Sequence, residues 1–113
     1  MSPKKLDSTL AVSAPIFAAL GDAIRLRLVA RLSAGGPLSI TTLAAGATVT
    51  RQAITKHLHV LEGAGLVHGA RHGREQLWEL QPRQLLAARR CLEIIERQWD
   101  AALSRLKDFV EMP

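Results

Sequence analysis

Hydrophobic residues recur at intervals of three and four over most of the chain, which is the spacing of amphipathic helices. Residues 1–14 are polar and irregular, and we expect them to form a flexible N-terminal arm. The periodic region begins at Pro15, a residue favoured in the first turn of a helix, and its first helix ends at Gly21. Asp22 is a natural N-cap for the next helix, which the run Gly35-Gly36-Pro37 ends.

Two helices of different length are predicted in the middle of the chain. Residues 38–40 are compatible with a short strand, and Thr41 can cap a short helix that Gly46 breaks. Thr48 or Thr50 opens a longer helix, in which apolar residues recur at steps of four and three. These apolar residues are Ile54, Leu58 and Leu61. Two helices separated by a few residues are the components of a helix-turn-helix.

The pattern then changes to two short strand-like runs, residues 66–67 and 76–80, on either side of a turn at residues 69–74. This predicts a β-hairpin with a basic tip. A long helix follows from Pro82 to about Val110, with an apolar seam at heptad spacing. The seam consists of Leu85, Ala88, Leu92, Ile95, Trp99, Ala102, Leu106 and Phe109. The order of elements predicts a mainly α winged helix-turn-helix domain over residues 15–113, with a C-terminal dimerisation helix at about 82–110.

Composition and charge narrow the class of protein. A length of 113 residues suits one domain, and a hydrophobic fraction of 48% supports a compact core. The single cysteine, Cys91, excludes a disulfide-stapled scaffold, and there is neither a secretory signal nor an apolar run that could cross a membrane. We therefore expect a cytoplasmic protein without a membrane partner. The net charge of +5 favours an anionic partner such as nucleic acid.

Two motifs carry a resemblance to a known family. The run ITKHLHVLEGAGLV at residues 54–67 resembles the recognition-helix signature of the arsenic-repressor (ArsR) family of bacterial transcriptional regulators. The run FAALGDAIRLRL at residues 17–28 is similar to the motif that begins the second helix in that family. Both lie in the expected order and spacing, and with the hairpin they cover residues 15–80. The resemblance implies a regulator that binds double-stranded DNA.

Polar side chains on the recognition helix and the hairpin are the candidates for DNA contact. Glutamine can pair bidentately with adenine and arginine with guanine, while threonine and lysine commonly contact phosphates. Cations at a hairpin tip can follow the phosphate backbone or enter a minor groove. The candidates are Thr48, Thr50, Arg51, Gln52, Thr55, Lys56, His57, His59, Arg71, His72 and Arg74. His57 faces partly inward, so a hydrogen bond to the preceding helix is the alternative for it.

A metal or redox sensor is the main alternative within the family. The resemblance places metal-binding thiolates on the short helix before the recognition helix, but residues 40–45 contain no Cys, His, Asp or Glu. The last helix has no histidine, and Cys91 stands alone on or beside the apolar seam, where a buried thiol is usual. The tail motif from Gln98 to Leu106 resembles a branch that generally lacks metal sites. We predict no metal and no cofactor, and the sequence does not identify an effector.

The resemblance also implies dimerisation through the first and last helices. The predicted interface contains Ile16, Leu20, Leu92, Ile95, Trp99, Ala102 and Leu106. No catalytic set of residues is visible, so an enzyme is not expected. The sequence predicts a homodimeric repressor that binds an inverted-repeat operator. The alternative from another class of function is a winged helix used only for protein–protein contact. The arginines of the hairpin tip disfavour this alternative.

Overall fold

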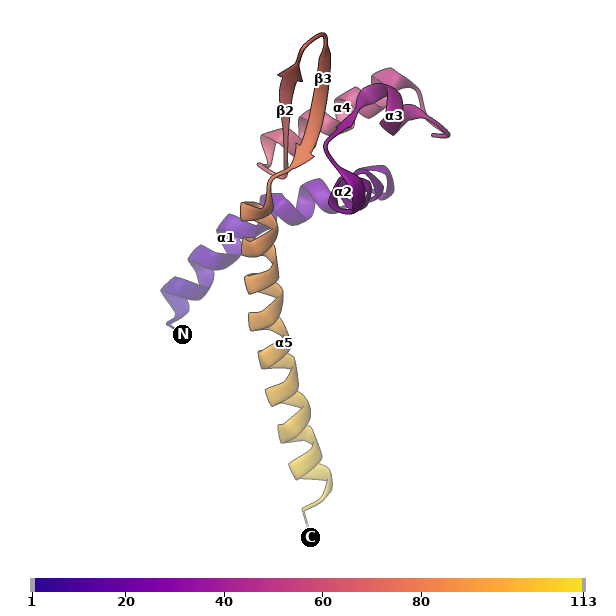
Figure 1. Cartoon of the computed structure of the whole chain (residues 1–113). Helices are drawn as coiled ribbons and strands as arrows, with labels where there is room; N and C mark the ends of the chain where they lie inside the picture. The colour runs from indigo at the N-terminus through magenta and orange to yellow at the C-terminus, as the bar shows by residue number, and fades with distance from the viewer. Residues whose placement is uncertain (1, 113) are drawn as a thin grey trace.

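The computed structural model describes residues 2–112, and its helices and hairpin follow the predicted order (Figure 1). Its elements are α1 (Pro3–Leu20), α2 (Ala23–Gly35), β1 (Leu38–Ser39), α3 (Ile40–Ala44), α4 (Arg51–Gly63), β2 (Val67–His72), β3 (Glu75–Leu80) and α5 (Pro82–Val110). The predicted arm and the predicted domain also include residues 1 and 113, which lie outside the described part. The mainly α fold with a small antiparallel sheet is confirmed.

The first helix begins twelve residues earlier than the sequence pattern indicates, at Pro3. The backbone N–H of Lys5 donates to the Ser2 hydroxyl at 3.3 Å, so Ser2 and Pro3 provide the cap and first-turn proline. Pro15 lies inside the helix, which packs on α5 and buries Ser13 there. The prediction of an irregular arm is therefore wrong for residues 3–14, because packing on a distant helix stabilises this segment.

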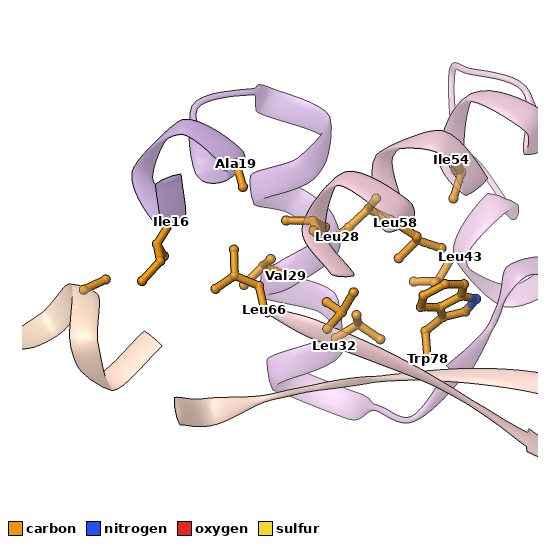
Figure 2. Packing of buried hydrophobic residues seen from close by; sticks show 13 residues of the cluster. Ile16, Ala19, Leu28, Val29, Leu32, Leu43, Ile54, Leu58, Leu66 and Trp78 are labelled. Carbon is orange, nitrogen blue, oxygen red and sulfur yellow. The ribbon is translucent and has the colours of Figure 1, made fainter. Parts of the chain in front are cut away.

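One apolar core joins α2, α4 and the sheet (Figure 2). The predicted stripe of α4 is confirmed, because Ile54, Leu58 and Leu61 are at most 1% exposed. Trp78 from β3 is 2% exposed and packs in the same cluster. Complete burial of each large apolar side chain contributes about 1.5–3 kcal/mol, so these residues hold the recognition helix firmly on the domain.

The sheet is antiparallel with strand order β1-β3-β2, and its hairpin turn is shorter than predicted. His72 pairs with Glu75, which leaves a two-residue turn at Gly73 and Arg74 rather than a loop over residues 69–74. Gly73 has a φ of +64° and Arg74 has no positive φ, as in the type II′ turns whose twist matches that of the strands. Gly69 faces Trp78, where a Cβ atom would lie 3.3 Å from the indole ring. Of the basic residues at the tip, Arg71 and His72 therefore lie on a paired strand and Arg74 lies in the turn.

Helix α5 continues well beyond the folded body, which gives the chain principal extents of 70 × 30 × 20 Å (Figure 1). Its first half buries Ala88 and Cys91, while residues 95–112 are all exposed. Within residues 2–112 no single helix is long and apolar enough to cross a membrane. Taken together, the consecutive helices α1 and α2 reach the length and apolar composition of a membrane span, but the pair is bent by 97° at the break between them.

Candidate nucleic-acid interface

The exposed face of α4 gathers four of the predicted DNA-contacting residues. Arg51, Gln52, Thr55 and Lys56 line one open hollow along the helix. Arg51, Gln52 and Lys56 are exposed, while Thr55 is half-buried and its hydroxyl donates to the Arg51 carbonyl at 3.0 Å. Because the opposite face of the helix is anchored in the core, this hollow presents two cations and one amide to solvent. An exposed helix of this chemistry suits a DNA major groove.

The two threonines before α4 have different surroundings. The Thr50 hydroxyl accepts a hydrogen bond from the Ala53 backbone N–H at 3.1 Å, so Thr50 is the N-cap. Thr48 is exposed in the turn between α3 and α4. Ser39 rather than Thr41 caps α3, since its hydroxyl accepts from the Thr42 N–H at 3.1 Å. The cap of α4 is thus one of the two predicted, and the cap of α3 lies two residues before the predicted one.

His59 is exposed but already has two neighbours. Its Nδ1 lies 3.4 Å from Glu62 Oε1, and its ring meets the Trp78 ring edge-on with centroids 5.6 Å apart. These contacts hold the imidazole on the side of α4 that faces the hairpin. His59 therefore lies at the boundary between the recognition helix and the sheet.

His57 turns inward, toward the start of α2. Its Nδ1 lies 3.3 Å from Arg25 Nη1 and 3.9 Å from Asp22 Oδ1, and its side chain is 20% exposed. These contacts agree with the alternative for His57, a hydrogen bond to a preceding helix, and that helix is α2. His57 thus differs from Arg51, Gln52 and Lys56, which are exposed on α4.

Asp22 completes this group of charged residues. Its carboxylate accepts from the backbone N–H groups of Arg25 at 3.1 Å and Ile24 at 2.9 Å. The hydrogen bond from Arg25, the one from Ile24 and the nearby positive charge of Arg25 lower the pKa of Asp22 more than partial burial raises it. The sequence identified Asp22 only as an N-cap, and its contact with α4 comes from the packing of two helices.

The hairpin tip and the start of α4 face one shared hollow. The tip residues Arg71, His72 and Arg74 are all exposed. Arg74 and Arg51 line the same hollow as Ser39 and Thr41, two hydroxyl residues that sequence analysis did not assign to the interface. Their only signal in the sequence is a position at the start of α3. The structure therefore brings the recognition helix and the hairpin together into one cationic surface, which Glu75 partly offsets.

A separate apolar surface runs along the exposed half of α5. Leu92, Ile95, Trp99 and Leu106 are 53%, 47%, 66% and 58% exposed, and Ala102 is exposed as well. Ile16, which the sequence assigns to the same interface, is 1% exposed and packs in the core of its own chain. Leu20 is half-buried against that core. The interface prediction thus needs correction at Ile16, because that side chain already packs in the core of its own chain.

The groups considered for metal or redox chemistry do not come together in the described residues. Within residues 2–112, no three His, Cys, Asp or Glu side chains are placed to hold a metal ion. Cys91 is 3% exposed and lies on the face of α5 that meets the rest of the chain. The expected burial of this thiol is confirmed.

Comparisons with known proteins agree with this architecture. A family model described as a helix-turn-helix domain matches residues 20–70. The HTH-type transcriptional regulator Rv2034 of Mycobacterium tuberculosis is 37% identical over 93 residues, which cover 82% of this chain and 83% of that protein. The ArsR-like transcriptional regulator of Rhodococcus sp. RHA1 is 36% identical, with a TM-score of 0.76 over 94% of this chain and 99% of that one.

A more distant structure shares the fold. It is the homodimeric winged helix-turn-helix DNA-binding domain Mb0332 of Mycobacterium bovis, with 19% identity and a TM-score of 0.60. The alignment covers 100% of this chain and 94% of that one. The relatives with higher identity are transcription regulators and not enzymes. Their match over most of the chain, together with the helix-turn-helix and hairpin described above, shows that this protein belongs to the ArsR family of winged helix-turn-helix transcriptional regulators.

Proposed function

We propose that this regulator binds an inverted-repeat operator in double-stranded DNA as a homodimer and represses transcription. The observation that carries the proposal is the open hollow on the exposed face of α4, which is lined by Arg51, Gln52, Thr55 and Lys56. In a major groove, Arg51 and Gln52 would contact base edges, while Lys56 and the hairpin arginines would contact phosphates. The net charge of +5 per chain supplies the salt-sensitive attraction to the backbone.

The exposed apolar face of α5 supports the homodimer. Trp99 and its apolar neighbours expose a large hydrophobic surface that a second copy of the helix could cover. Large aromatic side chains commonly supply much of the binding free energy at the centre of an interface. A distant protein of the same fold is homodimeric, which agrees with this assignment. A two-fold dimer requires an operator with two related half-sites.

Repression in the cytoplasm is the regulatory role that we propose. A dimer that occupies two half-sites within a promoter blocks access of the polymerase by its volume alone. A promoter–reporter assay with and without the protein tests this sense of regulation. Reporter output that falls when the protein is present agrees with repression, and output that rises contradicts it.

Selection of bound sequences from a random DNA pool tests the main proposal. We expect an imperfect inverted repeat with half-site centres about one helical turn, roughly 34 Å, apart. The protein with both Arg51→Ala and Gln52→Ala is the matched variant, since both side chains are exposed and outside the core. A winged helix that serves only protein–protein contact would enrich no DNA sequence, and that result would overturn the proposal.

A further inference from the structure

A pocket of about 220 Å³ opens beneath the turn of the helix-turn-helix, between α2, α3 and residues 45–49. Its most buried lining residues are Leu28, Leu43 and Ile54, which are at most 3% exposed and come from three separate helices (Figure 2). It shares no lining residue with the hollow on the exposed face of α4. The pocket therefore reaches the hydrophobic core from a side that the DNA-contacting residues of α4 do not use.

The walls of this pocket are also apolar. Ile24 and Val49 line it and are half-buried against the core. Gly46, on the connecting turn, leaves space, because a Cβ atom added there would meet nothing within 4 Å. An apolar cavity of about 150 Å³ can hold benzene, so this pocket can accept one aromatic ring with a small substituent.

The charged residues that line the pocket are both arginines. The guanidinium group of Arg31 donates to the carbonyl of Leu43 at 3.0 Å and to that of Thr42 at 3.2 Å. Arg27 is exposed and enters no ion pair within residues 2–112. No Asp or Glu lines the pocket to offset these charges. An apolar body with one anionic group is the ligand that matches these walls.

We propose that this pocket binds a small aromatic monocarboxylate of about the size of benzoate. The ring would lie against Leu28, Leu43 and Ile54, and its transfer from water to this apolar surface would favour binding. The carboxylate would remain at the mouth and pair with Arg27, whose planar guanidinium group suits bidentate contact with a carboxylate. This binding requires no DNA and no second copy of the chain.

Occupancy of the pocket would also act on DNA binding, a consequence that rests on the proposed function. Thr48 and Val49 line the pocket and directly precede Thr50, the N-cap of α4. A ligand that contacts this turn favours one placement of the recognition helix over others. By thermodynamic linkage, the carboxylate and DNA then change each other's affinity by the same factor.

Calorimetric titration of the full chain with sodium benzoate at constant ionic strength tests the binding, and amide NMR shifts locate it. We expect saturable binding, shifts concentrated in residues 24–31 and 43–54, and much weaker binding of benzamide, the neutral isostere. Arg27→Gln should weaken benzoate binding about threefold to tenfold, the range expected for a partly exposed charge pair. Arg83→Gln is the matched control, because Arg83 is exposed on α5 and does not line the pocket.

A second variant tests the volume of the pocket. Ala47→Phe places a ring at an exposed position that lines the pocket. Because the new side chain would occupy the space of the benzoate ring, it should weaken benzoate binding at least about tenfold. If this variant does not fold, the comparison of Arg27→Gln with Arg83→Gln still decides the question. Benzoate binding that fails to saturate, equals that of benzamide, or shifts residues along α5 instead would overturn the proposal.

Measurement of operator affinity with and without benzoate separates this inference from the proposed function. If the chain binds benzoate in the pocket but no DNA, the proposed function fails and the ligand site stands. If it binds DNA but no benzoate, the ligand site fails and the proposed function stands. Bound benzoate that leaves the operator affinity unchanged would overturn the linkage between the two sites.

Discussion

Nη1 of Arg25 lies 3.3 Å from Nδ1 of His57, and this contact joins the start of α2 to the middle of the recognition helix. The same guanidinium group donates through Nε to the Ala19 carbonyl at 2.6 Å, near the end of α1. One arginine therefore links three helices. Because a charged guanidinium group contacts both the imidazole of His57 and a carbonyl at the end of α1, these contacts stabilise the relative placement of α1, α2 and α4.

Replacement of Arg25 should therefore lower the stability of the fold and leave the sequence preference of DNA binding unchanged. Arg25→Ala removes a charged donor from half-buried partners, and we expect a loss of about 1–3 kcal/mol in the free energy of unfolding. Urea denaturation followed by circular dichroism measures this loss. Arg27→Ala is the matched control, since Arg27 is exposed on the same helix and should have little effect. Equal effects of the two variants would contradict the linking role of Arg25.

The carboxylate of Asp22 should make stability depend on pH in the acid range. Its pKa in the folded state is lowered, so its contribution is fully present above the unfolded value of about 3.9 and is lost as the pH falls through the folded value. Asp22→Asn keeps a good N-cap but removes this charge. The stability difference between the two proteins should therefore shrink as the pH falls below about 4. A difference that grows on acidification would contradict the direction of the shift.

The residues on the exposed face of α4 should divide into two classes by their effect on DNA binding. Arg51→Ala or Gln52→Ala removes a bidentate base contact and should cost about 1–3 kcal/mol at one base-pair position, which relaxes the preference there. Lys56→Ala should weaken binding to all sequences alike. Affinities for a panel of single-base operator variants distinguish the two patterns. If both Arg51 and Gln52 variants keep the wild-type preference, Thr48, Thr55 or His59 must read the bases instead.

The hairpin should contribute to affinity without contributing to sequence preference. A dimer that neutralises six to ten phosphates should lose about three to five decades of affinity between 50 and 200 mM salt. Replacement of Arg71 and Arg74 by alanine should reduce the salt slope by about two per chain, one for each lost phosphate contact. Fluorescence anisotropy over a salt series measures the slope. Relaxed preference at a single base pair would show instead that the hairpin reads bases.

The apolar face of α5 should control assembly rather than the stability of the single chain. Trp99 is 66% exposed in the single chain, so Trp99→Ala should affect dimerisation much more than folding. Ile95→Glu would bury an unpaired carboxylate in the interface, and we expect it to yield monomers. Monomers lack the avidity that two linked DNA-binding domains provide, so they should bind the operator far more weakly.

Size-exclusion chromatography with light scattering measures this change in assembly. Arg97→Glu is the matched control, because Arg97 is exposed one helical half-turn away from the positions of Ile95 and Trp99. A stable dimer of the Ile95→Glu variant with normal operator affinity would show that the subunits pair through another surface.

Local signals in the sequence were sufficient for the elements that carry the family signature. The predicted apolar stripe of α4, Thr50 as one of its two predicted caps, and the long helix from Pro82 to about Val110 all agree with the structure. These features depend on residues within one or two turns of each other, through capping hydrogen bonds and helical periodicity. The sequence by itself therefore determined the order of elements and the face of α4 that is exposed.

Contacts between segments far apart in the chain decided the rest. Residues 3–14 are helical although they look irregular, because α1 packs on α5 about seventy residues later. Ile16 is buried in its own chain, although the resemblance assigned it to the dimer interface, and the partner of the inward-facing His57 is Arg25 from a distant helix. The pocket beneath the turn arises only where three helices converge. Periodicity within one element specifies which residues share a face, but which neighbour covers that face depends on the packing of the whole chain.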